Sequence, residues 1–227
     1  MEALAIFDVD GTLTDSVALD DRVYRVTLAE VFGFELEREF FGDFPNVTDS
    51  GVLESLFLER FGRKPSFDEI DGFVRRFVHS LSQELASAAR CAQIGGAGRF
   101  LESLRRSQRW AVALATGSFS ASARLKLAAA GIGWERWIAS ADDAVSREDI
   151  FALAIERSGG TRARTVLVGD AEWDARTARR LGIAFVGVAP MRRGAKLRAL
   201  GAADVLADFR DRRRAREVLD AAVALAR

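Results

Sequence analysis

Several residue types are scarce in this 227-residue chain, and each scarcity excludes a kind of chemistry. Cys91 is the only cysteine, so an intrachain disulfide is impossible and thiol–disulfide chemistry has no support. His79 is the only histidine and lies in an amphipathic segment, where a surface or core position is a simpler role than catalysis. Only three of the 33 basic residues are lysines, at positions 64, 126 and 196. Cysteine and histidine chemistry is therefore not indicated, and a reducing compartment suits the chain.

Long apolar runs and an excess of one charge are also absent. No stretch approaches the length of a membrane-spanning helix, and the first residues lead into a strand without a signal-peptide pattern. The net charge is +0, which does not favour nucleic acid or an anionic membrane as a partner. With 49% apolar residues the chain can bury a core as one large domain or two modest ones. We expect a cytoplasmic protein that acts on a small molecule, and its oligomeric state cannot be deduced from the sequence.

The stretch ALAIFDVDGTLTDS, residues 3–16, places acids directly after an apolar strand pattern. Open α/β sheets bind their ligands at the ends of such strands. Asp8 and Asp10 lie one residue apart, and a divalent cation is the simplest way to hold two carboxylates in one small space. Gly11 permits a tight turn, and Thr12 can offer a hydroxyl and a backbone N–H to an anion. The stretch therefore predicts a phosphate site beside a metal ion.

Residues 17–89 have a different pattern, with apolar residues at helical spacing in the segments 19–33, 50–61 and 67–88. We predict a helical insert here, joined to the rest of the chain by hinges near 15–19 and 86–95. Thr48 and Asp49 directly precede the second of these helices. They are favoured N-cap residues, and contact with a substrate is a second role that is compatible with capping.

Strand and helix patterns alternate from residue 95 onward. The predicted strands lie in WAVALATGS, at 137–140, in TVLVG, in AFVGV and at 202–206. The predicted helices lie at 119–131, 148–158 and 174–181, followed by an arginine-rich helix near the end of the chain. This alternation predicts an α/β fold with a parallel, doubly wound sheet.

Two further strand patterns end in residues that suit the same chemistry. Thr116 and Gly117 offer a hydroxyl and backbone N–H groups to phosphate oxygens. Asp170 and Asp174 follow the VLVG strand, one at its end and the other one turn into the next helix. Together with Asp8 they would form a cluster of three carboxylates, which requires a cation. Asp170 is the better metal ligand, whereas Asp174 could bind directly, act through water or orient the site from behind.

The motif DxDGTLxDS, unbroken from Asp8 to Ser16, resembles the first motif of the haloacid dehalogenase-like (HAD) phosphohydrolase superfamily. Thr116 resembles its second motif, and the GDxxxD pattern that contains Asp170 resembles its fourth, which holds Mg²⁺. The third motif is normally a lysine that neutralises the nucleophile and the phosphate. The position that fits holds Arg147, 31 residues after Thr116. Arginine keeps the charge but is bulkier and binds carboxylates differently.

This resemblance implies a Rossmann-like core domain, residues 1–16 and 90–227, with an α-helical cap domain at 17–89, as in the phosphoglycolate phosphatase-like branch. It implies Mg²⁺ as the cofactor, bound by Asp8, Asp10, Asp170 and Asp174. The implied catalytic residues are Asp8 as nucleophile, Asp10 as acid and base, Thr116 and Arg147. The residues expected to bind the substrate are Gly11, Thr12, Thr48, Asp49, Thr116, Gly117 and Arg147.

We therefore predict a Mg²⁺-dependent phosphatase that hydrolyses a small organic phosphate monoester through an aspartyl phosphate. A phosphomutase shares all four motifs and remains an alternative. A haloacid dehalogenase is less favoured, because halide leaves without a proton and that reaction has no use for Asp10 or a magnesium cluster. A non-catalytic binding protein that keeps the fold is a further alternative, and the only residue that favours it is Arg147, which stands where the family normally has lysine.

Overall fold

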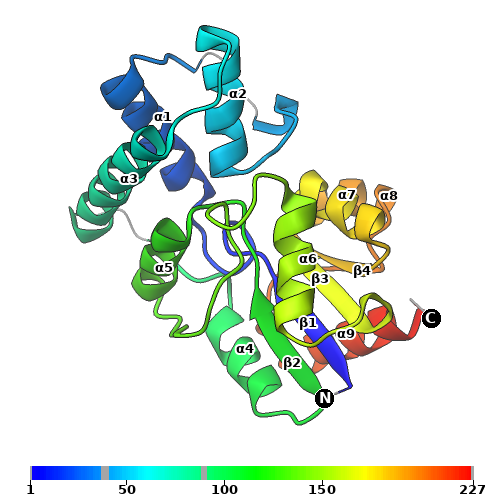
Figure 1. Ribbon diagram of the computed structural model, residues 1–227. Coiled ribbons are helices and arrows are strands. Elements are labelled where there is room, and N and C mark those ends of the chain that lie inside the picture. The colour runs from blue at the N-terminus through cyan, green and yellow to red at the C-terminus, as the bar shows by residue number, and fades with distance from the viewer. Residues whose placement is uncertain (1, 37–40, 88–90, 226–227) are drawn as a thin grey trace.

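The computed structural model describes residues 2–36, 41–87 and 91–225 (Figure 1). Within these ranges five parallel strands form one sheet in the order β2-β1-β3-β4-β5. The strands are β1 (Ala3–Phe7), β2 (Trp110–Leu114), β3 (Thr165–Gly169), β4 (Ala184–Val188) and β5 (Asp204–Leu206). The helices are α1 (Val17–Phe32), α2 (Asp49–Phe61), α3 (Phe67–Ser87), α4 (Ala97–Arg105), α5 (Ser120–Ala129), α6 (Arg147–Arg157), α7 (Glu172–Leu181), α8 (Met191–Ala199) and α9 (Arg212–Leu225).

The sheet is buried on both faces, which explains why its strands are continuously apolar. In β1, Leu4 and Ile6 face a core that includes residues of α6 and α7, whereas Ala5 and Phe7 face a second core with α4 and α9. Helices therefore cover both sides of a parallel sheet, and the predicted Rossmann-like α/β fold is confirmed. In the described part of the chain, no helix has the length and apolar character needed to cross a membrane.

Helices α1, α2 and α3 form a separate layer beside the carboxyl ends of the strands, and we call residues 17–87 the helical insert (Figure 1). Aromatic side chains such as Tyr24, Phe57, Phe73 and Phe77 fill its interior. Phe119, next to α5, belongs to the same cluster, so the insert packs on the α/β unit. Helix α1 begins at Val17, and the predicted end of the insert at 89–90 lies outside the described residues.

Two features differ from the sequence-based expectation. The predicted strand at 137–140 is wrong: only Ala139 bridges to Ala115, because Ser140 immediately enters a turn closed by Asp142 and Asp143. Helix α8 was not predicted, and it places basic side chains near the carboxyl end of the sheet. The other predicted strands are confirmed, and the predicted helices are confirmed with ends shifted by one or two residues.

Candidate active site

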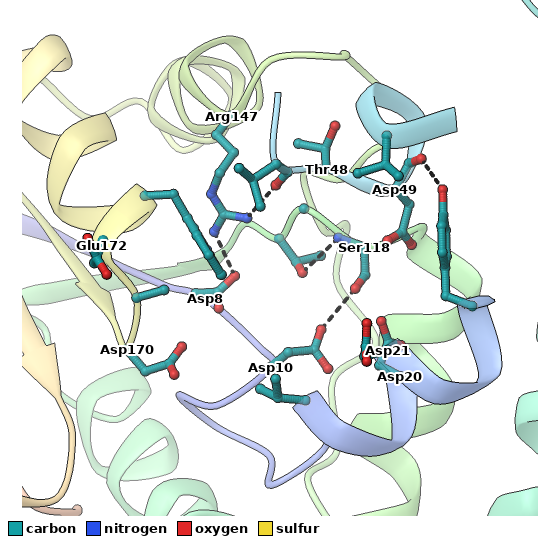
Figure 2. Close-up of a pocket in the computed structure, with 18 of the residues that line it drawn as sticks. Asp8, Asp10, Asp20, Asp21, Thr48, Asp49, Ser118, Arg147, Asp170 and Glu172 are labelled. Carbon is teal, nitrogen blue, oxygen red and sulfur yellow. Dashed lines mark hydrogen bonds and ion pairs between the residues drawn. The ribbon is translucent and has the colours of Figure 1, made fainter. Parts of the chain in front are cut away.

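The carboxyl ends of three adjacent strands meet at one cavity of about 520 Å³ (Figure 2). Asp8 follows β1, Thr116 comes just after β2, and Asp170 follows β3. Because β1 pairs with both β2 and β3, these three side chains emerge side by side at the same edge of the sheet. All three line the cavity, so the convergence expected from the strand patterns is present in the fold.

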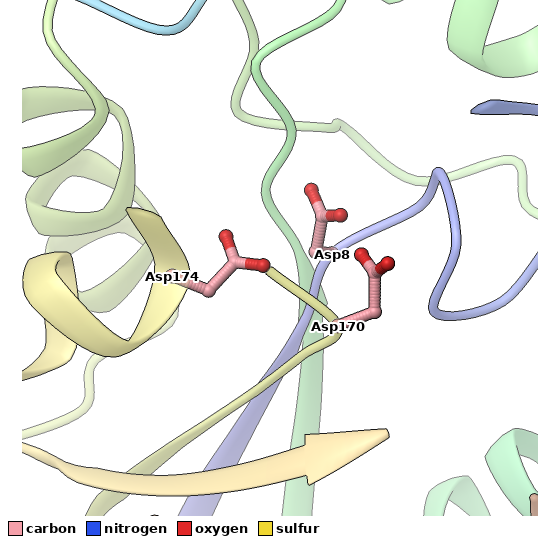
Figure 3. Close-up of side chains that lie close together, drawn as sticks. All are labelled: Asp8, Asp170 and Asp174. Atoms are coloured by element: carbon pink, nitrogen blue, oxygen red, sulfur yellow. The ribbon is translucent and has the colours of Figure 1, made fainter. Parts of the chain in front are cut away.

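Asp8 and Asp170, which line this cavity, form a cluster of three carboxylates with Asp174 (Figure 3). Each of Asp8, Asp170 and Asp174 offers one oxygen, and these oxygens lie within 4.8 Å of one another. Asp174 reaches the cluster from the first turn of α7, where its other oxygen accepts a hydrogen bond from the Ala171 N–H at 3.1 Å. All three side chains are buried. Water therefore screens their mutual repulsion only weakly.

The turn after β1 packs closely against the Asp170 carboxyl group. Gly11 has a φ of 77°, which favours glycine, and a Cβ there would overlap the Asp170 carboxylate. The N–H of Gly11 donates to the Thr14 carbonyl, and the N–H of Thr12 donates to the Val9 carbonyl. These bonds close the turn. Neither Gly11 nor Thr12, which the sequence suggests as substrate-binding residues, is among the residues that line the cavity. The Thr12 hydroxyl is fully buried.

Arg147 provides the positive charge next to the carboxylate cluster. It is the first residue of α6, directly after the N-cap Ser146, and its side chain is 6% exposed. Its Nη2 lies 3.2 Å from Oδ1 of Asp8 and 2.5 Å from Oδ1 of Asp174, and its Nη1 donates to the Val47 carbonyl at 3.4 Å. The guanidinium also lies over the Phe151 ring. The arginine thus supplies a buried positive charge to Asp8 and Asp174.

Burial and crowding raise the pKa of two carboxyl groups in the cluster, Asp8 and Asp170. The pKa of Asp8 lies well above its ordinary value because the carboxyl is buried and faces Asp174, although Arg147 opposes this shift. Burial and the charge of Asp174 raise the pKa of Asp170 to about 7, against the opposing effect of Arg193. Arg147 and the largely exposed Arg193 together carry less charge than the three carboxylates. Buried oxygen ligands with excess negative charge are what a hard cation such as Mg²⁺ requires, so the donor set fits this ion.

The Asp10 side chain belongs to a different set of contacts and is not part of the three-carboxylate cluster. Its Oδ1 accepts a short hydrogen bond from the Ser16 hydroxyl. Its Oδ2 accepts from the Ser118 hydroxyl at 2.9 Å and from Lys126 Nζ at 2.8 Å. Burial alone would raise the pKa of Asp10, but Lys126 and the hydrogen bonds bring it below its ordinary value. Asp10 is therefore held as a carboxylate at the edge of the cavity.

Lys126 is not among the site residues predicted from the sequence. It lies in α5, is fully buried and contacts Asp10 and Asp20. Burial would lower its pKa, and the two aspartates raise it instead. Burial raises the pKa of Asp20 to about 6, although the charge of Lys126 opposes this shift. The sequence feature that could have pointed to Lys126 is that it is a lysine in a chain whose basic residues are almost all arginines.

The loop between β2 and α5 and the start of α2 meet at the upper wall of the cavity (Figure 2). The Thr116 hydroxyl accepts a hydrogen bond from the Ser118 N–H at 3.1 Å. Thr48 is the N-cap of α2, as predicted, and its hydroxyl also donates to the Val145 carbonyl at 2.6 Å. The Asp49 N–H donates to the Gly117 carbonyl, and its carboxylate accepts the Phe119 N–H at 2.8 Å. The helical insert is thus bonded directly to the second strand's loop.

Other lining residues come from elements for which no site role was expected. On the helical insert they are Val17, Asp20, Asp21, Tyr24 and Val52, and on α7 and α8 they include Glu172, Trp173, Arg192, Arg193 and Lys196. The basic residues of α8 partly pair with acids: Lys196 contacts Glu172, and Arg193 lies 3.4 Å from Asp170. No local motif marks these residues, because only the tertiary fold brings α1 and α8 to the same cavity.

Comparisons with known proteins agree with this architecture. A relative from Dickeya dadantii (strain 3937), described as "Probable phosphatase IndB", is 28% identical over 199 residues, which are 83% of this chain and 81% of the relative. The crystal structure of a hydrolase from Pseudomonas syringae superposes with a TM-score of 0.73 at 21% identity, covering 95% of this chain and 98% of that one. CbbY from Rhodobacter sphaeroides, in complex with xylulose-(1,5)bisphosphate, gives a TM-score of 0.70 at 20% identity and 93% and 96% coverage.

These two solved structures are similar in fold, and the sequence match to a family is a separate finding. The family model for haloacid dehalogenase-like hydrolases matches residues 3–182, which include the carboxyl ends of β1, β2 and β3 but not those of β4 and β5. The match therefore spans Asp8 and Asp174 and the Arg147 side chain that contacts both of them. This chain belongs to the haloacid dehalogenase-like hydrolase family.

Proposed function

We propose that this hydrolase is a Mg²⁺-dependent phosphatase that cleaves a small organic phosphate monoester through an aspartyl phosphate on Asp8. The observation that supports this most directly is the buried cluster of Asp8, Asp170 and Asp174 with Arg147 beside it, at a cavity. The relative named as a probable phosphatase and the sugar bisphosphate bound to CbbY suggest the same class of substrate.

Asp8 is the nucleophile in this proposal. Its carboxylate oxygen bonds to phosphorus while the ester P–O bond breaks, and the alcohol leaves. Arg147 lies 3.2 Å from Asp8, where it neutralises the carboxylate and can hold a phosphate oxygen. Asp8, Asp170 and Asp174 would hold Mg²⁺, which supplies positive charge to the oxygens of the transferring phosphoryl group.

Asp10 carries the proton. Its resting carboxylate takes up a proton when the phosphate ester binds, gives it to the leaving alcohol oxygen, and then takes one from the water that cleaves the aspartyl phosphate, so the proton is recovered in each turnover. Its oxygens are held by Ser16, Ser118 and Lys126 at the edge of the cavity, which suits a group that must face first the alcohol and then water. Such acid–base assistance is typically worth about 10²–10⁴ in rate.

The helical insert acts as a cap in this proposal. Its Thr48 and Asp49 are bonded to the loops that follow β2 and precede α6, and both side chains line the cavity opposite Asp8. Val17, Tyr24 and Val52 add apolar surface to the same wall. The insert therefore both shields the phosphate site from water and contacts the organic part of the substrate.

Release of inorganic phosphate from p-nitrophenyl phosphate and a panel of metabolite phosphates, with and without Mg²⁺, tests the proposal. We expect Mg²⁺-dependent turnover by the wild type and only background rates for Asp8→Asn, because the amide cannot form the aspartyl phosphate. Asp68→Asn makes the same change on the exposed start of α3, away from the cavity, and should behave as wild type. Undiminished activity in Asp8→Asn would contradict the proposal.

A further inference from the structure

Lys126 is a fully buried cation with no contact to the cavity surface. Its Nζ donates to Oδ2 of Asp10 at 2.8 Å, to Oδ1 of Asp20 at 2.5 Å and to the Ser118 hydroxyl at 3.0 Å. An ammonium group has three N–H donors, and here each donor has its own acceptor. The site is therefore complete, and it is specific for the geometry of a lysine.

Arginine would not fill this position in the same way. A guanidinium is planar and presents five donors in a fixed fork, whereas an ammonium is a compact point charge. The other two lysines, Lys64 and Lys196, are exposed, with side chains 68% and 65% accessible. A chain that uses arginine for nearly all of its basic residues thus keeps one buried lysine, next to the acid that carries the proton in the proposed reaction.

The contacts of Lys126 join two parts of the molecule. Asp10 follows β1 in the α/β unit, whereas Asp20 lies in the first turn of α1, at the beginning of the helical insert. Ser118 donates to the same Asp10 oxygen that accepts from Lys126, so the serine and the lysine together fix one face of that carboxylate. A movement of α1 away from the sheet would remove Asp20 from this arrangement.

We propose that Lys126 is a positioning residue that holds the Asp10 carboxylate toward the reacting oxygen and, through Asp20, connects that hold to the placement of the helical insert. The inference rests on the proposed phosphatase function. Because Lys126 does not line the cavity, it acts through Asp10 and not on the substrate.

The test is a double-mutant cycle with p-nitrophenyl phosphate and Mg²⁺. We expect Lys126→Met to lower kcat by about 10²-fold, the effect of a misplaced catalytic group, with little change in KM. On an Asp10→Asn background the same substitution should cause no further loss, because its effect passes through Asp10. An equal loss on both backgrounds, or no loss in the single variant, would overturn the proposal.

A second pair of variants covers the case in which Lys126→Met does not fold, since removal of the lysine leaves buried carboxylates without a partner. Asp20→Asn keeps the size of the side chain and removes one of those charges. The double variant Asp20→Asn/Lys126→Met should then show about the same 10²-fold loss in kcat relative to Asp20→Asn alone. Equal kcat values for these two proteins would contradict the role of Lys126.

The wild type and Asp8→Asn separate this inference from the function on which it rests. If the wild type shows no Mg²⁺-dependent turnover, or if Asp8→Asn retains it, the phosphatase proposal fails and the role of Lys126 fails with it. If the wild type is active, Asp8→Asn is inactive and Lys126→Met matches the wild type in kcat, only the inference about Lys126 fails.

Discussion

At the scale of single residues, the site contains fewer buried positive charges than buried carboxylates. Arg147 faces Asp8 and Asp174, and Lys126 faces Asp10 and Asp20. Each cation is buried, so its removal would leave carboxylates without compensation in a medium that screens charge poorly. The two basic residues therefore contribute to folding as well as to the proposed chemistry.

Replacement of Arg147 should reveal this double role. We expect Arg147→Met to lower the free energy of unfolding of the metal-free protein by about 3–5 kcal/mol, because the partner carboxylates remain buried. Urea unfolding in the presence of a chelator measures this. Arg180 lies on the surface, paired with Glu148, and Arg180→Met should cost no more than about 1 kcal/mol. Similar losses for the two variants would show that the burial of Arg147 adds nothing to its contribution.

The sequence predicted those site residues that stand next to recognisable strand ends. Asp8, Thr116 and Asp170 follow apolar strands, and the spacing of four places Asp174 one turn into the next helix. Lys126 could not be placed in this way, because it lies 116 positions from Asp10 and only the packing of α5 brings the two together. The turn at Gly11 and Thr12 was also out of reach, since its N–H groups could serve either an anion or the turn itself.

At the scale of secondary-structure elements, the loop after β2 is the point where the helical insert meets the α/β unit. The carbonyl of Gly117 accepts the Asp49 N–H at 2.7 Å, and the N–H of Phe119 is bonded to the Asp49 carboxylate. A Cβ on Gly117 would overlap the Arg147 guanidinium and would lie 2.9 Å from the Val47 carbonyl oxygen. Glycine is therefore required here for close contact between these segments.

A methyl group at position 117 should push the loop after β2 away from the start of the helical insert's second helix, α2. We expect Gly117→Ala to displace the start of α2 or the Arg147 side chain and to lower kcat/KM for p-nitrophenyl phosphate by about 10²-fold, as for an error of ~1 Å in position. Hydrogen exchange at residues 48–52 should become faster, because the bond from Asp49 to Gly117 is lost.

Gly72→Ala provides a matched control for that variant. A Cβ on Gly72, in α3, meets no atom within 4 Å, and alanine is the better helix former by about 0.5–1 kcal/mol. This variant should keep its activity and become slightly more stable. If Gly117→Ala behaves in the same way, the contact between the loop and the helical insert does not need a glycine.

Elements were predicted well where hydrophobic periodicity determines the structure and poorly where neighbouring segments do. The strands of the sheet are apolar along their whole length because both faces are covered, and this pattern was recognised. Trp137 to Ser140 has a similar composition, but the turn at Ser140 to Asp143 ends its pairing after a single bridge. Helix α8 contains several basic residues and a glycine, so its sequence alone gave no clear helical pattern.

At the scale of the whole molecule, the proposed active site is built from both structural units. The insert contributes Asp20, Thr48 and Asp49, and the α/β unit contributes the carboxylate cluster and Arg147. The hydrophobic cluster of the insert includes Phe119 and Ala141, which belong to the α/β unit, so the two units share buried surface. Stabilisation of the carboxylate cluster should therefore raise the temperature at which the entire chain unfolds.

Binding of a divalent cation should raise the melting temperature. Three buried carboxylates face one buried guanidinium, Arg147, and one largely exposed guanidinium, Arg193, and a cation that binds only the folded state relieves their repulsion. At a Mg²⁺ concentration of about 100 times Kd the gain is about 2.7 kcal/mol, which for a chain of this size corresponds to roughly 5–10 °C. Differential scanning fluorimetry of chelator-treated protein with increasing MgCl₂ measures it, with NaCl of equal ionic strength as the salt control. Asp170→Asn should shift much less than the wild type, because it removes one charged ligand, and equal shifts in the two proteins would place the cation elsewhere.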